Sequence, residues 1–177
     1  AALTSTTLAY PAQERFAYMA ANVDCAASPK ALSYHIHVTY MMTNDDQVQT
    51  VSALRDAAEL EFADLLGEDV VCEGTLIEPS GRYDNARLCM IYDHNITNGE
   101  TLGPFAIGEW SMYVPPHYLT TVSPWFIQQR GEFSVLIHPN TGCEFEDHSN
   151  WAQWVGPAWN MDMSIFTAGV QTNEFGE

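Results

Sequence analysis

The clearest pattern in the chain is an alternation of apolar and polar positions over residues 33–41. Such alternation has the two-residue period of a β-strand and divides the side chains between the two faces of a sheet. One face carries the apolar set Tyr34, Ile36, Val38 and Tyr40. The other face carries the polar set His35, His37 and Thr39. We therefore expect two imidazole rings to project from the same side of one strand.

A helical pattern follows this strand. Asn44 is a suitable N-cap, and Asp45 and Asp46 suit the positive end of a helix dipole. Apolar residues then recur at steps of three and four over residues 48–65, which predicts one helix with a single apolar stripe. Gly67 is the expected stop of that helix.

Shorter patterns indicate the remaining elements. Strand-like runs occupy residues 70–77, 86–92, 109–114 and 132–138. A proline–glycine turn signal separates the first two runs, so either run, or both as a hairpin, supplies the second strand. A helix is expected over residues 118–129, with a break or kink at Pro124. Another short helix is expected over residues 147–155, capped by Asp147 or Ser149.

The order βαββαβ, followed by a C-terminal extension, predicts an α+β fold of the ferredoxin-like sandwich type. In that topology the histidine-bearing first strand lies between the strands of Glu109 and His138. Two helices cover one face of the sheet, and we expect a second subunit to cover the other, as in a dimeric α+β barrel. The single domain is expected over residues 31–177, after an irregular N-terminal arm at residues 1–30.

Composition narrows the classes of partner. The chain has 177 residues, which suits one domain, and 46% of them are hydrophobic, enough to form a core. No apolar run reaches the roughly 18 residues of a membrane span. There are 23 acidic residues against 6 basic ones, for a net charge of −17. Such a charge disfavours nucleic acid and anionic membranes as partners.

Several features predict a secreted protein. The four cysteines are Cys25, Cys72, Cys89 and Cys143. Their even number fits two disulfides, with three pairings open, and no CxxC spacing suggests a zinc or thioredoxin-type motif. The chain starts at Ala1 without a charged, apolar leader, as expected after removal of a signal peptide. Asn95 begins a sequon and is a candidate glycosylation site in a secreted protein.

The histidines indicate a metal site. If His138 faces the same side of the sheet as His35 and His37, imidazoles from adjacent strands converge, and Glu109 can add a carboxylate. Two histidines and one carboxylate, with positions left open, form the ligand set of non-haem iron(II) oxygenases. The four side chains are therefore candidate metal ligands. Non-haem Fe(II) is the expected metal, with zinc, copper and manganese as alternatives.

Other side chains are candidates for catalysis or substrate binding. His148 is a candidate acid or base, because the carboxylate of Asp147 can orient an imidazole or raise its pKa. Arg130 can hold a substrate carboxylate if it faces the cleft. Trp110 is a candidate substrate contact, with packing in the core as its alternative.

The same histidines also have ordinary explanations. An HxH pair on a strand can face solvent or bond to the backbone, and a single histidine before a proline is commonly structural. His94 and His117 lie in turn-like contexts and are expected on the surface. No GxSxG, GxGxxG, Walker or HExxH motif is present, which disfavours the chemistries that depend on those motifs.

Several segments resemble the DOPA 4,5-dioxygenase-like family, in its fungal type. The most specific is FSVLIHPNTG at residues 133–142, followed by Asp147-His148 and Trp154-Val155-Gly156. Shorter likenesses are YHIHVTY at residues 34–40, Gly103-Pro104, and Gly108-Glu109-Trp110. The resemblance spans about residues 32–165.

This resemblance implies a dimeric, ferredoxin-like subunit that cleaves a catechol such as DOPA in the extradiol manner with a non-haem metal. Bacterial relatives often carry a GPHP segment, and this chain has Phe105 in place of its histidine. The difference allows another substrate, another metal geometry or a loss of activity.

Three functions follow from these features. The first is a metal-dependent dioxygenase that acts on a small aromatic substrate and oxygen, working as a homodimer. The alternative is a secreted metal- or phenolic-binding protein on the same scaffold without ring-cleaving activity, which Phe105 favours. The third is an interaction protein whose open sheet face serves as a dimer surface. Bound metal would argue against the third function, and turnover would separate the first two.

Overall fold

The computed structural model describes residues 24–27, 29–71, 88–91 and 104–166. The strands are β1 (Ser33–Tyr40), β2 (Leu66–Val71), β3 (Leu88–Ile91), β4 (Gly108–Val114), β5 (Ser134–Asn140) and β6 (Gln153–Val155). The α-helices are α2 (Asp45–Glu61), α4 (Leu119–Gln129) and α5 (Glu144–His148). Short 3-10 turns are η1 (Cys25–Ala27), η2 (Pro116–Tyr118) and η3 (Met163–Ile165).

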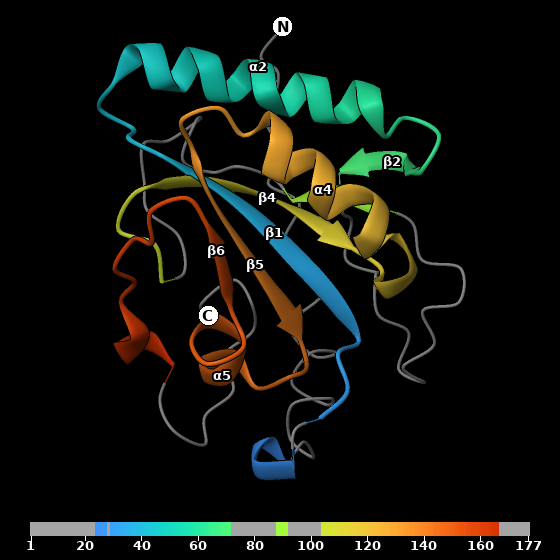
Figure 1. Cartoon of the computed structure of the whole chain (residues 1–177), viewed down its shortest axis with the longest axis vertical. Helices are drawn as coiled ribbons and strands as arrows, with labels where there is room; N and C mark the ends of the chain where they lie inside the picture. The colour runs from blue at the N-terminus through green and yellow to red at the C-terminus, as the bar shows by residue number, and fades with distance from the viewer. Residues whose placement is uncertain (1–23, 28, 72–87, 92–103, 167–177) are drawn as a thin grey trace, which may run out of the picture.

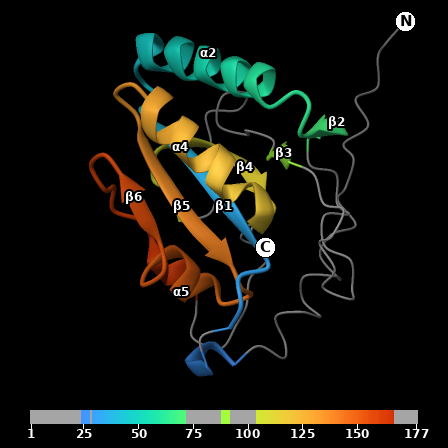
Figure 2. The same cartoon turned by 45° about the vertical axis from the view of Figure 1, so that its right-hand side comes forward.

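The strands form one sheet in the order β2-β3-β4-β1-β5-β6, which can be followed from edge to edge in Figure 2. The β1 strand pairs antiparallel with β4 on one side and with β5 on the other. This confirms the expected placement of the histidine-bearing strand between the strands of Glu109 and His138. The β2 and β3 strands pair in parallel, so they do not form a hairpin, which was one of the alternatives for this region.

Helices α2 and α4 lie over the same face of the sheet (Figure 1). The side chain of Asn44 accepts hydrogen bonds from the backbone N–H groups of Asp46 and Gln47, so the predicted cap is confirmed. The helix α4 continues through Pro124 without the expected break. Buried apolar side chains of both helices and of β1, β4 and β5 form the core. They include Ile36, Val38, Val51, Leu54, Trp110, Met112, Val122, Phe126 and Val135.

Two predicted helix boundaries are wrong. The helix α2 ends at Glu61, before a turn in which the N–H of Leu66 bonds to the carbonyl of Phe62. Residues of this turn still pack on the core, which is why the apolar stripe extends beyond the helix. The helix expected over residues 147–155 is instead α5, which ends at His148, and residues 153–155 form β6. Pairing with β5 therefore prevails over local helical preference at this edge.

The face of the sheet opposite α2 and α4 carries the histidines, and other parts of the same chain bury them. His35, His37 and His138 are each less than 10% exposed. Their burial therefore does not require a second subunit. No helix among the described residues is long and apolar enough to cross a membrane.

Candidate metal centre

Strand register brings three histidines together. His35 on β1 lies directly opposite His138 on β5. His37 lies opposite Leu136, and since Leu136 and His138 are two residues apart on β5, their side chains share one face of the sheet. One ring nitrogen from each of the three histidines lies within 4.8 Å of the other two. The predicted convergence of His138 with the HxH pair is thus present, on the side of the sheet that the alternation indicated.

Hydrogen bonds hold two of these rings in defined orientations. Nδ1 of His138 donates to the carbonyl of Pro139 at 2.8 Å, which leaves Nε2 of a neutral His138 ring as an acceptor. Nε2 of His37 lies 3.0 Å from Nε2 of His138. The opposite nitrogen of His37, Nδ1, lies 2.9 Å from Oε2 of Glu109. These contacts order a chain of groups from Glu109 through two imidazoles to a backbone carbonyl.

The surroundings keep His138 neutral. Burial lowers the pKa of His138 well below its ordinary value of 6.5, and the neighbouring imidazoles of His148, His37 and His35 lower it further. The hydrogen bond to Pro139 has a smaller, opposite effect. A neutral imidazole keeps the lone pair that a metal ligand requires.

The donor set fits a divalent metal ion. Two nitrogens bonded to one metal at right angles, each at about 2.1 Å, lie about 3 Å apart, as the two Nε2 atoms of His37 and His138 do. Metal-binding histidines typically donate their other N–H to a carboxylate or a carbonyl, and Glu109 and Pro139 supply these acceptors. With His35, the site could hold a metal on three buried imidazoles.

His148 lies beside this group. It is the last residue of α5, and its ring centroid is 4.0 Å from that of His138. Nδ1 of His148 donates to the carbonyl of Glu144 at 2.9 Å, and the Glu144 carboxylate lies 3.7 Å away. The Phe166 ring stacks on the His148 ring, with 4.8 Å between their centroids. His148 is therefore oriented by its own helix and lies within reach of the same space as the three other histidines.

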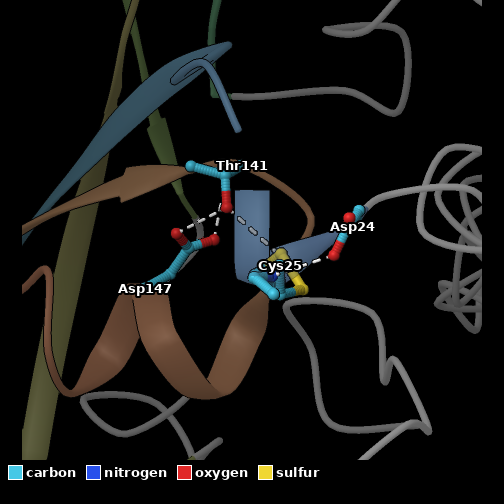
Figure 3. The surroundings of a disulfide bond; sticks show 6 residues. Asp24, Cys25, Thr141 and Asp147 are labelled. Carbon is cyan, nitrogen blue, oxygen red and sulfur yellow. Dashed lines mark hydrogen bonds between the residues drawn. A yellow bond between two sulfur atoms is a disulfide. The ribbon is translucent and has the colours of Figure 1, made fainter. Parts of the chain in front are cut away.

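Asp147 does not orient His148, contrary to expectation. Its two carboxylate oxygens accept hydrogen bonds from the backbone N–H and the hydroxyl of Thr141, both at 2.9 Å (Figure 3). This link across the turn after β5 has no signature in the sequence. Burial raises the pKa of Asp147 to about 6, against the opposing effect of these hydrogen bonds. Asp147 thus joins α5 to the end of β5, which is a structural role.

A disulfide secures the same junction. Cys25 is bonded to Cys143, the N-cap residue of α5, and 118 residues separate them in the sequence (Figure 3). The backbone N–H of Cys143 also donates to the Thr141 hydroxyl. Cys89 is disulfide-bonded as well. The expectation that the cysteines form disulfides is confirmed for these three residues, and Cys25–Cys143 is one of the pairings left open by the sequence.

Two phenyl rings flank the histidines. Phe105 is buried, and its ring centroid lies 4.8 Å from that of His37. Phe166 stacks on His148, also with 4.8 Å between the ring centroids. In the sequence, Phe105 differs from related proteins that carry a histidine at this position, and Phe166 lies in an irregular segment without a recognisable pattern. Together they make the surroundings of the imidazoles apolar.

The structure places the remaining candidates elsewhere. Trp110 is fully buried between the sheet and the helices, 5.8 Å from Phe126 by ring centroids, so its expected contact with a substrate is wrong. It alternates with Glu109 along β4 and therefore faces away from the histidines. Arg130 donates to the carbonyl of Phe133 at 2.7 Å, just after α4. Asn95 lies outside the described residues.

Comparison with known proteins points to one family. A sequence model of the Dopa 4,5-dioxygenase family matches residues 34–165. A DOPA 4,5-dioxygenase of Amanita muscaria is 21% identical over 163 residues, covering 92% of this chain and 62% of the relative. An uncharacterised 21.2 kDa protein of Botryotinia fuckeliana is 32% identical over 69 residues, covering 35% of this chain and 37% of the relative. The chain thus spans less than two thirds of the length of either curated relative.

A solved structure is also similar. It is a protein of Nostoc punctiforme that was provisionally assigned as a dioxygenase, with a TM-score of 0.48 and 19% identity. The match covers 76% of this chain and 90% of that one.

Proposed function

Since the chain belongs to the Dopa 4,5-dioxygenase family, we propose that it is a metal-dependent, extradiol-type dioxygenase acting on a catechol or a related phenolic. The observation that carries this proposal is the buried group of His35, His37 and His138, whose ring nitrogens lie close enough to share one metal. Extradiol cleavage breaks the ring bond beside the diol and places both atoms of O₂ in the product. The reaction therefore needs only the substrate and oxygen.

In this proposal the three imidazoles of His35, His37 and His138 hold the metal. Non-haem iron(II) is the preferred candidate, and zinc, copper and manganese are the alternatives. A bound iron(II) ion would supply the redox chemistry that lets oxygen react with an aromatic ring. Three protein ligands leave positions for other molecules, as catalytic metal sites do.

The protein's own side chains supply binding and proton transfer. His148 is the proposed acid and base, because its Nδ1 donates to the Glu144 carbonyl and its ring centroid lies 4.0 Å from that of His138. Phe105 and Phe166 flank the imidazoles and exclude water from the site. Their flat, apolar rings suit a planar aromatic substrate better than a sugar or a peptide.

Turnover is the test of this function. The full chain is loaded anaerobically with iron(II), mixed with a panel of catechols that includes DOPA, and exposed to oxygen. We expect one O₂ consumed per catechol, with the yellow absorbance of a ring-opened product. The His138→Ala variant should consume none. If the folded, iron-loaded protein consumes no oxygen with any catechol, the alternative of a metal- or phenolic-binding protein takes its place.

Three further properties are part of the proposal. The strand order β5-β1-β4-β3 supports a ferredoxin-like topology with additional edge strands. The disulfide between Cys25 and Cys143 supports secretion, because such bonds persist in oxidising compartments. A homodimer is proposed on the family resemblance, and sedimentation of the purified protein tests it.

A further inference from the structure

Of the four side chains predicted as metal ligands, Glu109 is the one outside the group of three imidazoles. Its Oε2 lies 2.9 Å from Nδ1 of His37, whereas Nε2 of the same ring faces His138. The carboxylate thus meets a different ring nitrogen of His37 from the one that faces His138. We infer that Glu109 is a positioning residue that holds His37 in the metal-binding orientation and is not itself a ligand. This inference rests on the metal centre proposed above.

Strand register explains how the two side chains meet. Glu109 on β4 lies opposite Thr39 on β1, and Ser111 lies opposite His37. Glu109 and His37 are therefore diagonal neighbours on one face of the sheet, a separation that long side chains can bridge. The residues directly opposite each of them, Thr39 and Ser111, are short and leave room for this contact.

The contact selects one tautomer of His37. An ionised carboxylate can only accept hydrogen bonds, so Nδ1 of His37 carries the hydrogen that Glu109 accepts. When a metal is bound, the lone pair of Nε2 is then the one available to it. The carbonyl of Pro139 imposes the same choice on His138 through its Nδ1. Two different acceptors thus direct both Nε2 atoms toward the same point.

Burial makes this arrangement rigid. Glu109 is 5% exposed and His37 is 7% exposed, so water does not compete for the carboxylate. A buried carboxylate needs a polar partner, and a buried imidazole that lost this acceptor could rotate or change its tautomer. Glu109 should therefore affect how strongly the site binds a metal without changing the number of protein ligands.

Nitrogen NMR of histidines, together with zinc affinity, tests the inference on the full chain. In the zinc-loaded, ¹⁵N-labelled protein, we expect Nδ1 of His37 to be protonated and Nε2 to carry the shift of a metal-bound nitrogen. Glu109→Gln and Glu109→Ala should retain the metal-bound nitrogen signals of His35 and His138. Their zinc affinity should fall about 10- to 100-fold, as for other partners of metal-binding histidines. The matched control Glu132→Gln changes an exposed carboxylate and should bind zinc like the wild type.

Three outcomes decide between the alternatives. If Glu109→Gln loses zinc as completely as His138→Ala, Glu109 is a ligand and the inference is overturned while the metal centre stands. If His37 binds zinc through Nδ1, the inference is overturned in the same way. If the folded wild type binds neither zinc nor iron(II), the proposed metal centre is wrong, and the inference, which rests on it, is wrong as well.

Discussion

Nε2 of His37 lies 3.0 Å from Nε2 of His138, although 101 residues separate them in the sequence. The two residues belong to adjacent central strands, and their rings are nearly parallel, with 15° between the planes. Nδ1 of each ring donates to another acceptor, Glu109 for His37 and the Pro139 carbonyl for His138, so the Nε2 atoms of the two neutral rings keep their lone pairs. A divalent cation bound by both Nε2 atoms would satisfy these lone pairs, which makes the pair a suitable centre for a metal site.

The first prediction concerns metal binding. His37→Ala and His138→Ala should each weaken the binding of zinc or iron(II) by more than about 100-fold, a larger loss than removal of a ligand's partner causes. Each variant removes one of three ring nitrogens that lie within 4.8 Å of one another. The measurement is a competition titration of each metal against a chelator.

The matched control is His117→Ala, because His117 is an exposed histidine on η2. It should bind metal like the wild type. Circular dichroism should show that all three variants keep their fold. If His37→Ala and His138→Ala bind metal as tightly as His117→Ala, His37 and His138 are not metal ligands.

The alternation rule predicted much of this site. It placed His35 and His37 on one face of β1. Applied to β5, it puts His138 on the same face as Leu136. The same rule, applied to β4, separates Glu109 from Trp110 and would have assigned Trp110 to the core. What the rule cannot supply is the register between strands, which sets His35 opposite His138.

The partners of His148 could not be predicted from the sequence, for a different reason. Asp147 precedes His148, but a side chain one residue away in a helix points in another direction. Its carboxylate instead reaches Thr141, and His148 bonds to Glu144, four residues earlier. Such links depend on where α5 starts and on how it docks, and the polar pattern of residues 147–155 fitted a different helix equally well.

The second prediction separates proton transfer from metal binding. His148→Gln should retain zinc and iron(II) affinity but lower kcat about 10²- to 10⁴-fold, because the variant has no group that titrates near neutral pH. Steady-state kinetics with the best catechol of the panel gives kcat, and metal titration gives affinity. Loss of metal from His148→Gln would instead show that His148 is a ligand.

The third prediction concerns the disulfide. The double variant Cys25→Ser/Cys143→Ser should lower the free energy of unfolding by about 2–5 kcal/mol, because the bond closes a long loop of the unfolded chain. Urea denaturation measures the loss. Since Cys143 is the N-cap of α5, kcat should fall as well, through a less ordered His148. An unchanged midpoint would mean that the bond does not constrain this junction.

The fourth prediction tests the corrected position of Trp110. Trp110→Phe should cost about 0.5–3 kcal/mol of stability, because it removes volume from a fully buried site. KM for the catechol should stay at its wild-type value, since the indole faces the helices rather than the histidines. A raised KM with unchanged stability would return Trp110 to the substrate site.

The fifth prediction is a pH dependence of stability that arises from Asp147. Its pKa is about 6 in the folded chain and 3.8 when unperturbed, so between these values the folded state binds the proton more tightly. This contribution to stability is fully present below pH 3.8 and is lost as the pH rises through about 6. At about 1.4 kcal/mol per pKa unit, the whole effect is at most about 3 kcal/mol.

Asp147→Asn removes the titrating group but keeps an oxygen that accepts from Thr141. The wild type should therefore lose stability relative to this variant between pH 4 and about pH 7, as measured by urea denaturation of metal-free protein. The exposed control Asp56→Asn should show a constant difference from the wild type over the same range. A constant difference for Asp147→Asn too would mean that the hydrogen bonds from Thr141 outweigh burial and that Asp147 stays ionised throughout.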